Sequence, residues 1–366
     1  MDDRPIGVFD SGFGGLTVAR ALIDLLPGED LVYVGDTGRY PYGPRPLDEV
    51  RAFARQITRK LVEQDNVKLV VVACNNATAA ALGNLRYEFD VPIVGVINAG
   101  VRALLAVTRT GRVGVVGTEG TISSGAYQGA VMDSRRAWRG GRRVQLTCAA
   151  CPGFVELVER GEPRGSRATQ LAERLLAPLR SAGVDSLLLG CTHYPYLART
   201  IGEVMGPEVV LVSSADETAF EVRSILLETG LGRRSRAAGC HRWFSSGEVG
   251  SFVSIGQHLF GQELDRAEHW EPPSLGADSA ALGSGRAGRD GRTGRTGRGA
   301  SRWSLHHSYG SSDHSSSATI SRAVPQAPVL GVKKSTGRDS GAYVAKSATG
   351  RLSGNGERVL PADYKE

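Results

Sequence analysis

Short apolar runs alternate with longer amphipathic stretches along the first 270 residues. A Val- and Leu-rich run such as 69–73 is typical of a strand buried on both faces, whereas apolar residues at helical spacing, as in 16–26, are typical of a helix. Strands are predicted at 6–10, 31–35, 69–73, 93–96, 113–117, 144–148, 186–190 and 209–212. Helices are predicted at 16–26, 48–64, 77–88, 99–108, 122–132, 153–160, 167–182 and 216–229. This alternation predicts an α/β fold with mostly parallel strands.

The pattern changes after Trp270. Residues 271–366 are rich in Gly, Ser and Arg, contain few aliphatic side chains, and carry a run of Gly-Arg triplets from 285 to 298. Such a composition buries too little apolar surface to offset the entropy of an ordered chain, so we predict a disordered C-terminal tail. An Arg/Gly tail can make weak contacts with nucleic acid, although a passive extension fits the composition better.

The formal net charge of +6 comes entirely from that tail. Residues 1–270 carry 30 Lys and Arg against 30 Asp and Glu, and residues 271–366 carry 14 against 8. The first 270 residues therefore lack the basic surface of a nucleic-acid-binding domain.

The N-terminus and the cysteines indicate the compartment. The first residues lack the basic and apolar regions of a signal peptide, and no apolar run approaches the ~20 residues that span a bilayer. Five scattered cysteines are too few for a disulfide scaffold in a chain of 366 residues. We therefore expect a cytoplasmic protein with reduced thiols.

Two cysteines each end an apolar run that is predicted to be a strand. Cys74 follows the run 69–73, Cys191 follows the run 186–190, and small polar residues come after both. Open α/β sheets bind ligands at the carboxyl ends of their strands, and the N-terminus of a following helix lowers the pKa of a thiol. One buried cysteine alone is more often an ordinary apolar residue. Two matched ones favour a pair of bases across one cleft, which can remove a proton from one face of a carbon and add one to the other.

Other ways of removing the α-proton of an amino acid find weaker support. Lys60 and Lys68 are the only lysines in residues 1–270, and neither lies at the carboxyl end of a predicted strand, which disfavours a pyridoxal cofactor. Cys148 and Cys151 have the CxxC spacing but no second pair, so they are more often ordinary residues than half of a zinc site or a redox pair. We expect neither a metal nor a cofactor.

Asp10 and His193 are two polar residues that could act next to the candidate thiols. Asp10 ends the first predicted strand before a glycine-rich turn, where it is either an Asx or helix-capping residue or a carboxylate near Cys74. The glycines do not have the GxGxxG spacing of dinucleotide-binding turns, and no phosphate-loop lysine follows them. His193 lies two residues after Cys191, where it either assists that thiol or caps a helix.

Four segments resemble, in order and at similar spacing, signature segments of the glutamate racemases. They are 10–17 (DSGFGGLT), 41–43 (PYG), 73–75 (ACN) and 190–195 (GCTHYP). The resemblance covers roughly residues 5–265 and places the chain in the cofactor-independent aspartate/glutamate racemase superfamily. It implies an isomerase that interconverts L- and D-glutamate and supplies D-glutamate for peptidoglycan, and hence for cell-wall biogenesis and cell shape.

Two alternatives stay open beside that activity. One is an aspartate racemase or another member of the same superfamily. The other is of a different class: a protein that binds nucleic acid or a partner through its basic tail.

The resemblance also implies the organisation of the chain. Two similar α/β domains would face each other across the site, each contributing one cysteine. The first would comprise 1–98 plus 208–270, the second 99–207, and the tail 271–366. The implied ligand is glutamate, with no membrane contact, no nucleic acid bound by the first 270 residues, and a homodimer as a further expectation.

The roles of individual residues follow from the resemblance as well. Cys74 would handle the α-proton of D-glutamate and Cys191 that of L-glutamate. Asp10 would support Cys74, while His193, with Glu159 behind it, would support Cys191. The residues implied to hold the carboxylates and ammonium group of the substrate are Asp10, Ser11, Tyr42, Gly43, Asn75, Asn76, Thr118, Thr121 and Thr192.

One position departs from the family pattern. After Cys-Asn the family carries a small hydroxyl residue, whereas this chain has Asn76. An asparagine can also hydrogen-bond a carboxylate, but it is bulkier, so we expect an effect on affinity or substrate preference.

Overall fold

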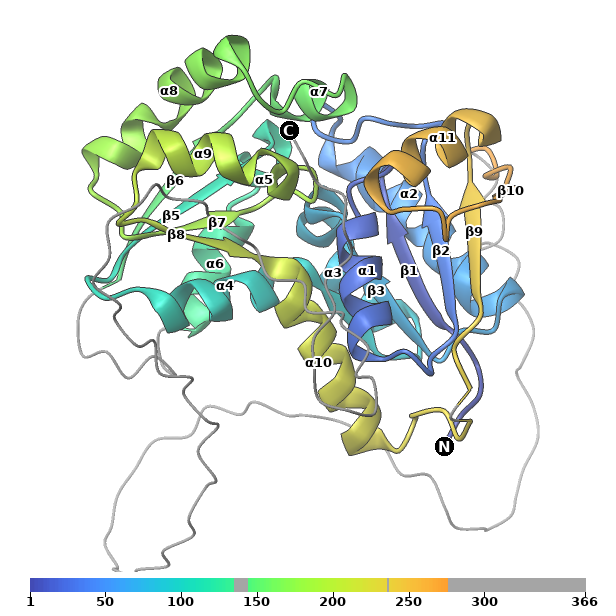
Figure 1. Ribbon diagram of the computed structural model, residues 1–366. Helices are drawn as coiled ribbons and strands as arrows, with labels where there is room; N and C mark the ends of the chain where they lie inside the picture. Colours follow the sequence, from blue (N-terminus) through green and yellow to red (C-terminus); the bar gives the residue numbers. More distant parts are fainter. Residues whose placement is uncertain (135–143, 236, 276–366) are drawn as a thin grey trace, which may run out of the picture. The chain divides into compact units, whose positions relative to one another are not determined.

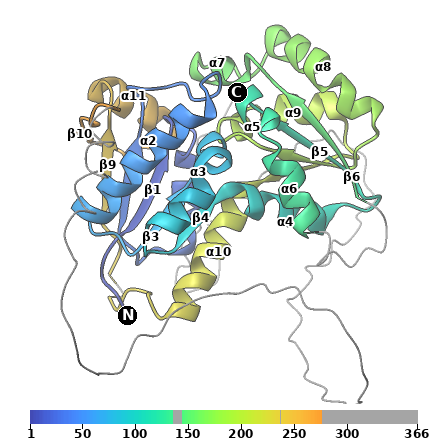
Figure 2. The same ribbon diagram turned by 180° about the vertical axis from the view of Figure 1, so that it is seen from behind.

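The computed structural model describes residues 1–134, 144–235 and 237–275, which contain two parallel β-sheets with helices on both faces (Figures 1 and 2). The six-stranded sheet has the order β10-β9-β2-β1-β3-β4 and the four-stranded sheet the order β6-β5-β7-β8. The strands are β1 (Ile6–Asp10), β2 (Leu31–Gly35), β3 (Leu69–Val72), β4 (Ile93–Gly95), β5 (Arg112–Gly117), β6 (Gln145–Ala150), β7 (Ser186–Leu189), β8 (Val210–Ser213), β9 (His241–Ser245) and β10 (Glu268–His269). The predicted α/β fold is confirmed.

Thirteen helical segments connect these strands in the described residues. They are α1 (Leu16–Leu25), α2 (Leu47–Arg59), η1 (Lys60–Gln64), α3 (Asn75–Glu88), α4 (Val96–Val107), α5 (Glu119–Ser123), α6 (Ala126–Ser134), α7 (Phe154–Glu159), α8 (Ser166–Ser181), η2 (Tyr194–Leu197), α9 (Ala198–Met205), α10 (Ser214–Thr229) and α11 (Val249–Leu259). None of them is both long and apolar enough to cross a membrane.

We call the six-stranded sheet with its helices the first lobe. Helices α1, α10 and α11 cover one face of this sheet, and α2 and α3 cover the other. The central strands are therefore buried on both faces, and β1 pairs in parallel with both β2 and β3. This double burial is why these strands read as continuous apolar runs rather than alternating ones.

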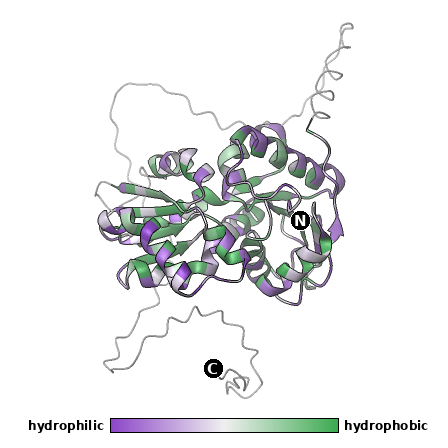
Figure 3. Ribbon diagram, turned by 90° about the horizontal axis from the view of Figure 1, so that it is seen from above, coloured by the Kyte–Doolittle hydropathy of each residue, from purple (hydrophilic) through white to green (hydrophobic). Residues whose placement is uncertain are grey.

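We call the four-stranded sheet with its helices the second lobe. Helices α7, α8 and α9 cover one face, and α4 and α6 cover the other. Figure 3 shows apolar residues concentrated on the strands and polar residues on the outer sides of the helices. Each lobe is thus a sheet between two layers of helices, with its core on both faces of the sheet.

The eight predicted strands lie within two residues of the observed ones, but some helices differ. The helix predicted at 122–132 is divided into α5 and α6 at Gly125, whose positive φ of 72° ends the first helix. The pattern also missed α9 and the last elements, β9, α11 and β10. In β9 a histidine and an arginine precede the apolar residues, because only its second half is buried.

The chain returns to the first lobe later than the expected boundary between 207 and 208. Strand β8 pairs in parallel with β7, which places residues 210–213 in the sheet of the second lobe. Helix α10 then packs its apolar face, including Ala219 and Val222, into the core of the first lobe. The amphipathic pattern could not show this, because a buried strand looks the same whichever sheet it joins. Of the predicted tail, residues 276–366 lie outside the described residues.

Candidate active site

A cavity of about 150 Å³ lies where strands of both lobes end. Ser11 follows β1, Cys74 comes just after β3, Thr118 follows β5, Cys151 follows β6 and Cys191 comes just after β7. These are all carboxyl ends of parallel strands, where loops and helix N-termini expose polar groups. The remaining lining residues are Tyr40, Pro41, Tyr42, Gly43, Pro44, Asn75, Asn76, Glu119, Thr121, Pro152, Gly153, Val155, Glu156, Thr192 and His193.

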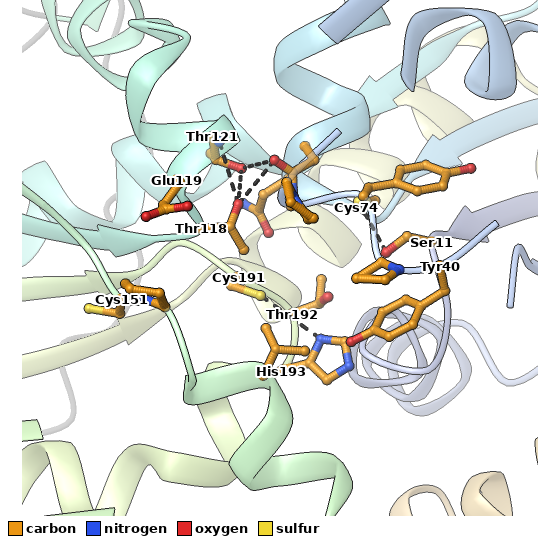
Figure 4. A pocket seen from close by; sticks show the side chains of 18 of the residues that line it. Ser11, Tyr40, Cys74, Thr118, Glu119, Thr121, Cys151, Cys191, Thr192 and His193 are labelled. Atoms are coloured by element: carbon orange, nitrogen blue, oxygen red, sulfur yellow. Dashed lines mark hydrogen bonds between the residues drawn. The ribbon is translucent and has the colours of Figure 1, made fainter. Parts of the chain in front are cut away.

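Cys74 and Cys191 both line this cavity, one from each lobe (Figure 4). Cys74 is the N-cap of α3, is 4% exposed, and its Sγ lies 3.7 Å from Oγ of Ser11. Burial, followed by the nearby charge of Asp10, raises the pKa of the Cys74 thiol to about 12. Cys74 is therefore a neutral thiol at neutral pH, suited to donating a proton.

Cys191 lies beside an imidazole instead of a carboxylate. Its Sγ is 3.9 Å from Nδ1 of His193, and Nε2 of His193 is 3.3 Å from Oε1 of Glu159. Burial by itself would lower the pKa of His193, but Cys191, Glu159 and Asp10 outweigh it and raise that pKa to about 10. His193 therefore stays charged at neutral pH and places a positive charge beside Sγ of Cys191.

Asp10 lies behind the cavity wall and links the two lobes. Its Oδ1 accepts a hydrogen bond of 2.9 Å from the backbone N–H of Gly12, and its Oδ2 accepts one of 3.2 Å from the hydroxyl of Thr192. Burial raises the pKa of Asp10, and the charge of His193 together with these hydrogen bonds only partly offsets that effect. Asp10 is thus both an Asx-type residue and a carboxylate close to Cys74 and His193.

Asn76 connects α3 of the first lobe to α5 of the second. Its Oδ1 accepts hydrogen bonds from the hydroxyls of Thr118, at 3.0 Å, and of Thr121, at 2.8 Å. The backbone N–H of Gly120 also donates to the carbonyl of Gly43 across the same junction, at 3.2 Å. The residue that departs from the family pattern is therefore satisfied by two threonines that the resemblance assigns to the site.

Asn75 makes a second connection between the lobes. Its Nδ2 donates to the hydroxyl of Tyr127 in α6, at 2.8 Å. Its Oδ1 is buried and has no hydrogen-bond partner among the described residues. That oxygen, in a residue that lines the cavity, is an acceptor suited to an ammonium group.

Tyr42 lines the cavity, but its hydroxyl is used elsewhere. It donates to the buried carboxylate of Asp36, which also accepts hydrogen bonds from Arg39, at 2.8 Å, and from Ser246, at 2.5 Å. Burial, followed by the negative charge of Asp36, raises the pKa of the Tyr42 phenol well above its usual value. Tyr42 can therefore face a ligand with its ring and backbone rather than its hydroxyl.

The sequence of this chain is similar to a family of racemases and to individual glutamate racemases. The chain matches the Asp/Glu/Hydantoin racemase family over residues 6–220. The chain belongs to this family. A glutamate racemase of Mycobacterium leprae is 50% identical over 258 residues, covering 70% of this chain and 92% of that protein. One of Parafrankia sp. is 49% identical over 265 residues, covering 72% of this chain and 93% of that protein.

Solved structures of racemases in this family have the same fold. The crystal structure of a glutamate racemase isoform from Bacillus anthracis matches with a TM-score of 0.69 and 37% identity, over 75% of this chain and 99% of that chain. The glutamate racemase from Thermus thermophilus, in complex with beta-chloro-D-alanine, matches with a TM-score of 0.66 and 39% identity, over 74% of this chain and 98% of that chain.

The cavity brings together all but two of the residues that the sequence singled out for the site. Asp10 and Glu159 do not line it, but they contact the lining residues Thr192 and His193 respectively. Sequence reasoning missed Tyr40, Glu119 and Glu156, and it treated Cys151 as an ordinary residue. Cys151 comes directly after the observed β6 and close behind the strand predicted at 144–148, and this position near a strand end was the signal that could have placed it here.

Proposed function

We propose that this chain interconverts L- and D-glutamate by moving the α-proton between two thiols. The supporting observation is that Cys74 and Cys191 approach one small cavity from different lobes. The glutamate racemases that it resembles at 49–50% identity support the same activity, which is an isomerase reaction. Within the family this reaction supplies D-glutamate for peptidoglycan.

The unequal surroundings of the two thiols suggest how the reaction runs. Starting from L-glutamate, a thiolate at Cys191 removes the α-proton, and the thiol of Cys74 donates its proton to the opposite face of the carbanion. His193 holds a positive charge next to Cys191, and burial keeps Cys74 protonated. The reverse reaction uses the same groups in opposite roles. Each thiol thereby acts once as a base and once as an acid, and two side chains carry the proton transfer.

Polar groups around the cavity would hold the substrate. In our proposal Asp10 supports Cys74, while His193 and Glu159 support Cys191. Hydroxyl, amide and backbone groups would bind the two carboxylates and the ammonium group and stabilise the carbanion. These groups belong to Ser11, Tyr42, Gly43, Asn75, Asn76, Thr118, Thr121 and Thr192, with Asp10 behind them.

Racemisation by the full-length protein tests this function directly. Circular dichroism would follow L-glutamate, D-glutamate and L-aspartate side by side without added cofactor, and we expect turnover of both glutamate isomers. In deuterated water the product should carry deuterium at its α-carbon. Turnover of aspartate in preference to glutamate would instead favour an aspartate racemase.

The two-thiol mechanism has its own test. Cys74→Ala and Cys191→Ala should each abolish racemisation, because each removes one of the two proton carriers. Cys240→Ala is the matched control, since Cys240 is an exposed free thiol outside the cavity. Full racemisation by either cavity variant would contradict the mechanism.

We further propose a cytoplasmic homodimer that needs no cofactor. The free thiols at the site support the compartment. Light scattering of the purified protein would give its mass in solution, and a monomeric mass would contradict the dimer.

A further inference from the structure

Tyr127 lies between the two chain segments that carry the candidate thiols. It belongs to α6 of the second lobe and is buried, with 1% of the residue exposed. Its hydroxyl accepts a hydrogen bond of 2.8 Å from Nδ2 of Asn75, the residue that follows Cys74 in the first lobe. This hydrogen bond therefore joins the two lobes directly beside one of the two thiols.

The same hydroxyl lies against the segment that carries the other thiol. Gly190 immediately precedes Cys191, and a Cβ atom at Gly190 would lie 2.6 Å from Oη of Tyr127 and 3.0 Å from its Cζ. A side chain at this position would displace the phenol, so glycine is needed here for close approach. The phenol is thus held between Gly190 and Asn75, which fixes the position of its hydroxyl.

The carboxamide of Asn75 depends on Tyr127 for its orientation. Asn75 is 4% exposed and lines the cavity. Among the described residues the hydroxyl of Tyr127 is the single hydrogen-bond partner of this carboxamide, because Oδ1 is buried without one. The terminal torsion of an asparagine is broad, so the amide group can turn once that hydrogen bond is lost. Tyr127 does not itself line the cavity, so it can affect a ligand only through its neighbours.

We propose that Tyr127 is a positioning residue of the racemase, whose hydroxyl fixes the carboxamide of Asn75 in the orientation that binds glutamate. Asn75 is one of the groups that hold the substrate in the proposed function, so this inference rests on that function. The donor and the acceptor lie in different lobes. The orientation of a substrate-binding group is therefore tied to the contact between the lobes.

Tyr127→Phe removes the hydroxyl but keeps the ring against Gly190. Without its hydrogen bond the carboxamide is free to turn, so KM for L-glutamate and for D-glutamate should each rise by roughly tenfold, with a smaller change in kcat. Partial unfolding of the variant would lower the apparent kcat but not change KM, which is a property of the folded molecules. Tyr87→Phe is the control and should leave KM unchanged, because Tyr87 lies in the same helix as Asn75 and is 95% exposed. An unchanged KM in Tyr127→Phe would overturn the proposal.

A double-mutant cycle tests whether Tyr127 acts through Asn75. If it does, Tyr127→Phe should weaken the binding of glutamate when Asn75 is present and have no further effect beside Asn75→Ala. Calorimetric titration of L-glutamate into variants that also carry Cys74→Ala measures this affinity without turnover, so a variant too slow for kinetics still gives a result. Losses of affinity that multiply would show that Tyr127 acts independently of Asn75 and would refute its positioning role.

The wild-type protein separates this proposal from the proposed function. Absence of racemisation by the wild type would refute the function itself. An active wild type whose Tyr127→Phe variant keeps the same KM would refute only the role of Tyr127.

Discussion

At the scale of single residues, the two thiols of the site differ in charge environment although their sequence contexts look alike. Both cysteines follow a buried strand and precede polar residues. Burial, followed by the charge of Asp10, raises the pKa of the Cys74 thiol, whereas Cys191 lies beside the positively charged His193. In our proposal this asymmetry prepares the resting enzyme to take a proton at Cys191 and to give one at Cys74.

The charge of His193 predicts the alkaline limb of activity. Conversion of L-glutamate should stay level above neutrality and fall as the pH passes about 10, where the imidazolium loses its proton. A pH–rate profile of kcat/KM measures this limb. His193→Asn should show a lower rate without that limb, and an identical limb in the variant would assign the titration to another group.

The same shift has a consequence for stability. The pKa of His193 is higher in the folded protein than its ordinary value of 6.5, so its charged form contributes stability that is complete below pH 6.5 and is lost as the pH rises to about 10. The urea midpoint of the wild type minus that of His193→Asn should therefore decrease as the pH rises from 6.5 to about 10. An increase in this difference would contradict a raised pKa of His193 in the folded protein.

Asn76 shows how a residue that departs from a family pattern can be accommodated. Its carboxamide oxygen accepts two threonine hydroxyls from the second lobe, so the larger side chain is satisfied where it lies. The hydroxyls of Thr118 and Thr121 also lie 3.1 Å apart, so the two threonines and the carboxamide of Asn76 form one connected hydrogen-bond network at this wall of the cavity.

At the scale of elements, the turn between β1 and α1 sets how closely the lobes approach. A Cβ at Gly14 would collide with the side chain of Thr192 and lie 2.7 Å from Nδ1 of His193. A Cβ at Gly15 would lie 2.5 Å from Cβ of Asp10. Neither glycine has a positive φ, so the backbone conformation does not require glycine at these positions. The short distances to neighbouring side chains require it instead.

Gly14→Ala should disturb the site through this contact. The added methyl group must displace Thr192 and His193, so we expect at least tenfold lower kcat/KM and a loss of about 1–3 kcal/mol in the free energy of unfolding. Gly83→Ala in α3 is the control, because nothing lies within 4 Å of its added Cβ. That change should leave activity unaltered and stabilise the helix by up to about 1 kcal/mol. Enzyme kinetics and urea unfolding of both variants provide the comparison, and unaltered kinetics in Gly14→Ala would contradict the close approach.

At the scale of the whole molecule, the racemase relatives account for only part of the chain. The match to the Mycobacterium leprae protein covers 92% of that protein but 70% of this chain. The part of this chain outside the match is similar in length to the Gly-, Ser- and Arg-rich residues 271–366, which supply the whole net charge. The relatives therefore carry their fold without such a segment.

Truncation after residue 275 tests this division. The shortened protein should keep its kcat, its KM and its thermal unfolding midpoint, because every residue of the cavity precedes 194. Retention on DNA at low salt, if the full chain shows it, should disappear with the truncation. A large loss of racemisation would assign a catalytic or structural role to the removed segment.

The sequence alone determined the fold class, most strands and the two cysteines, because buried parallel strands leave continuous apolar runs and the residues after them are local in the chain. It could not determine which sheet β8 joins, nor that Tyr40 and Glu156 line the same cavity. Those facts depend on which distant segments pair and pack, and no periodicity along the chain records that. Only the tertiary structure brings the carboxylates of Asp10 and Glu159 to Cys74 and His193, because these groups are distant in the chain, whereas His193 is a near neighbour of Cys191 in the sequence itself.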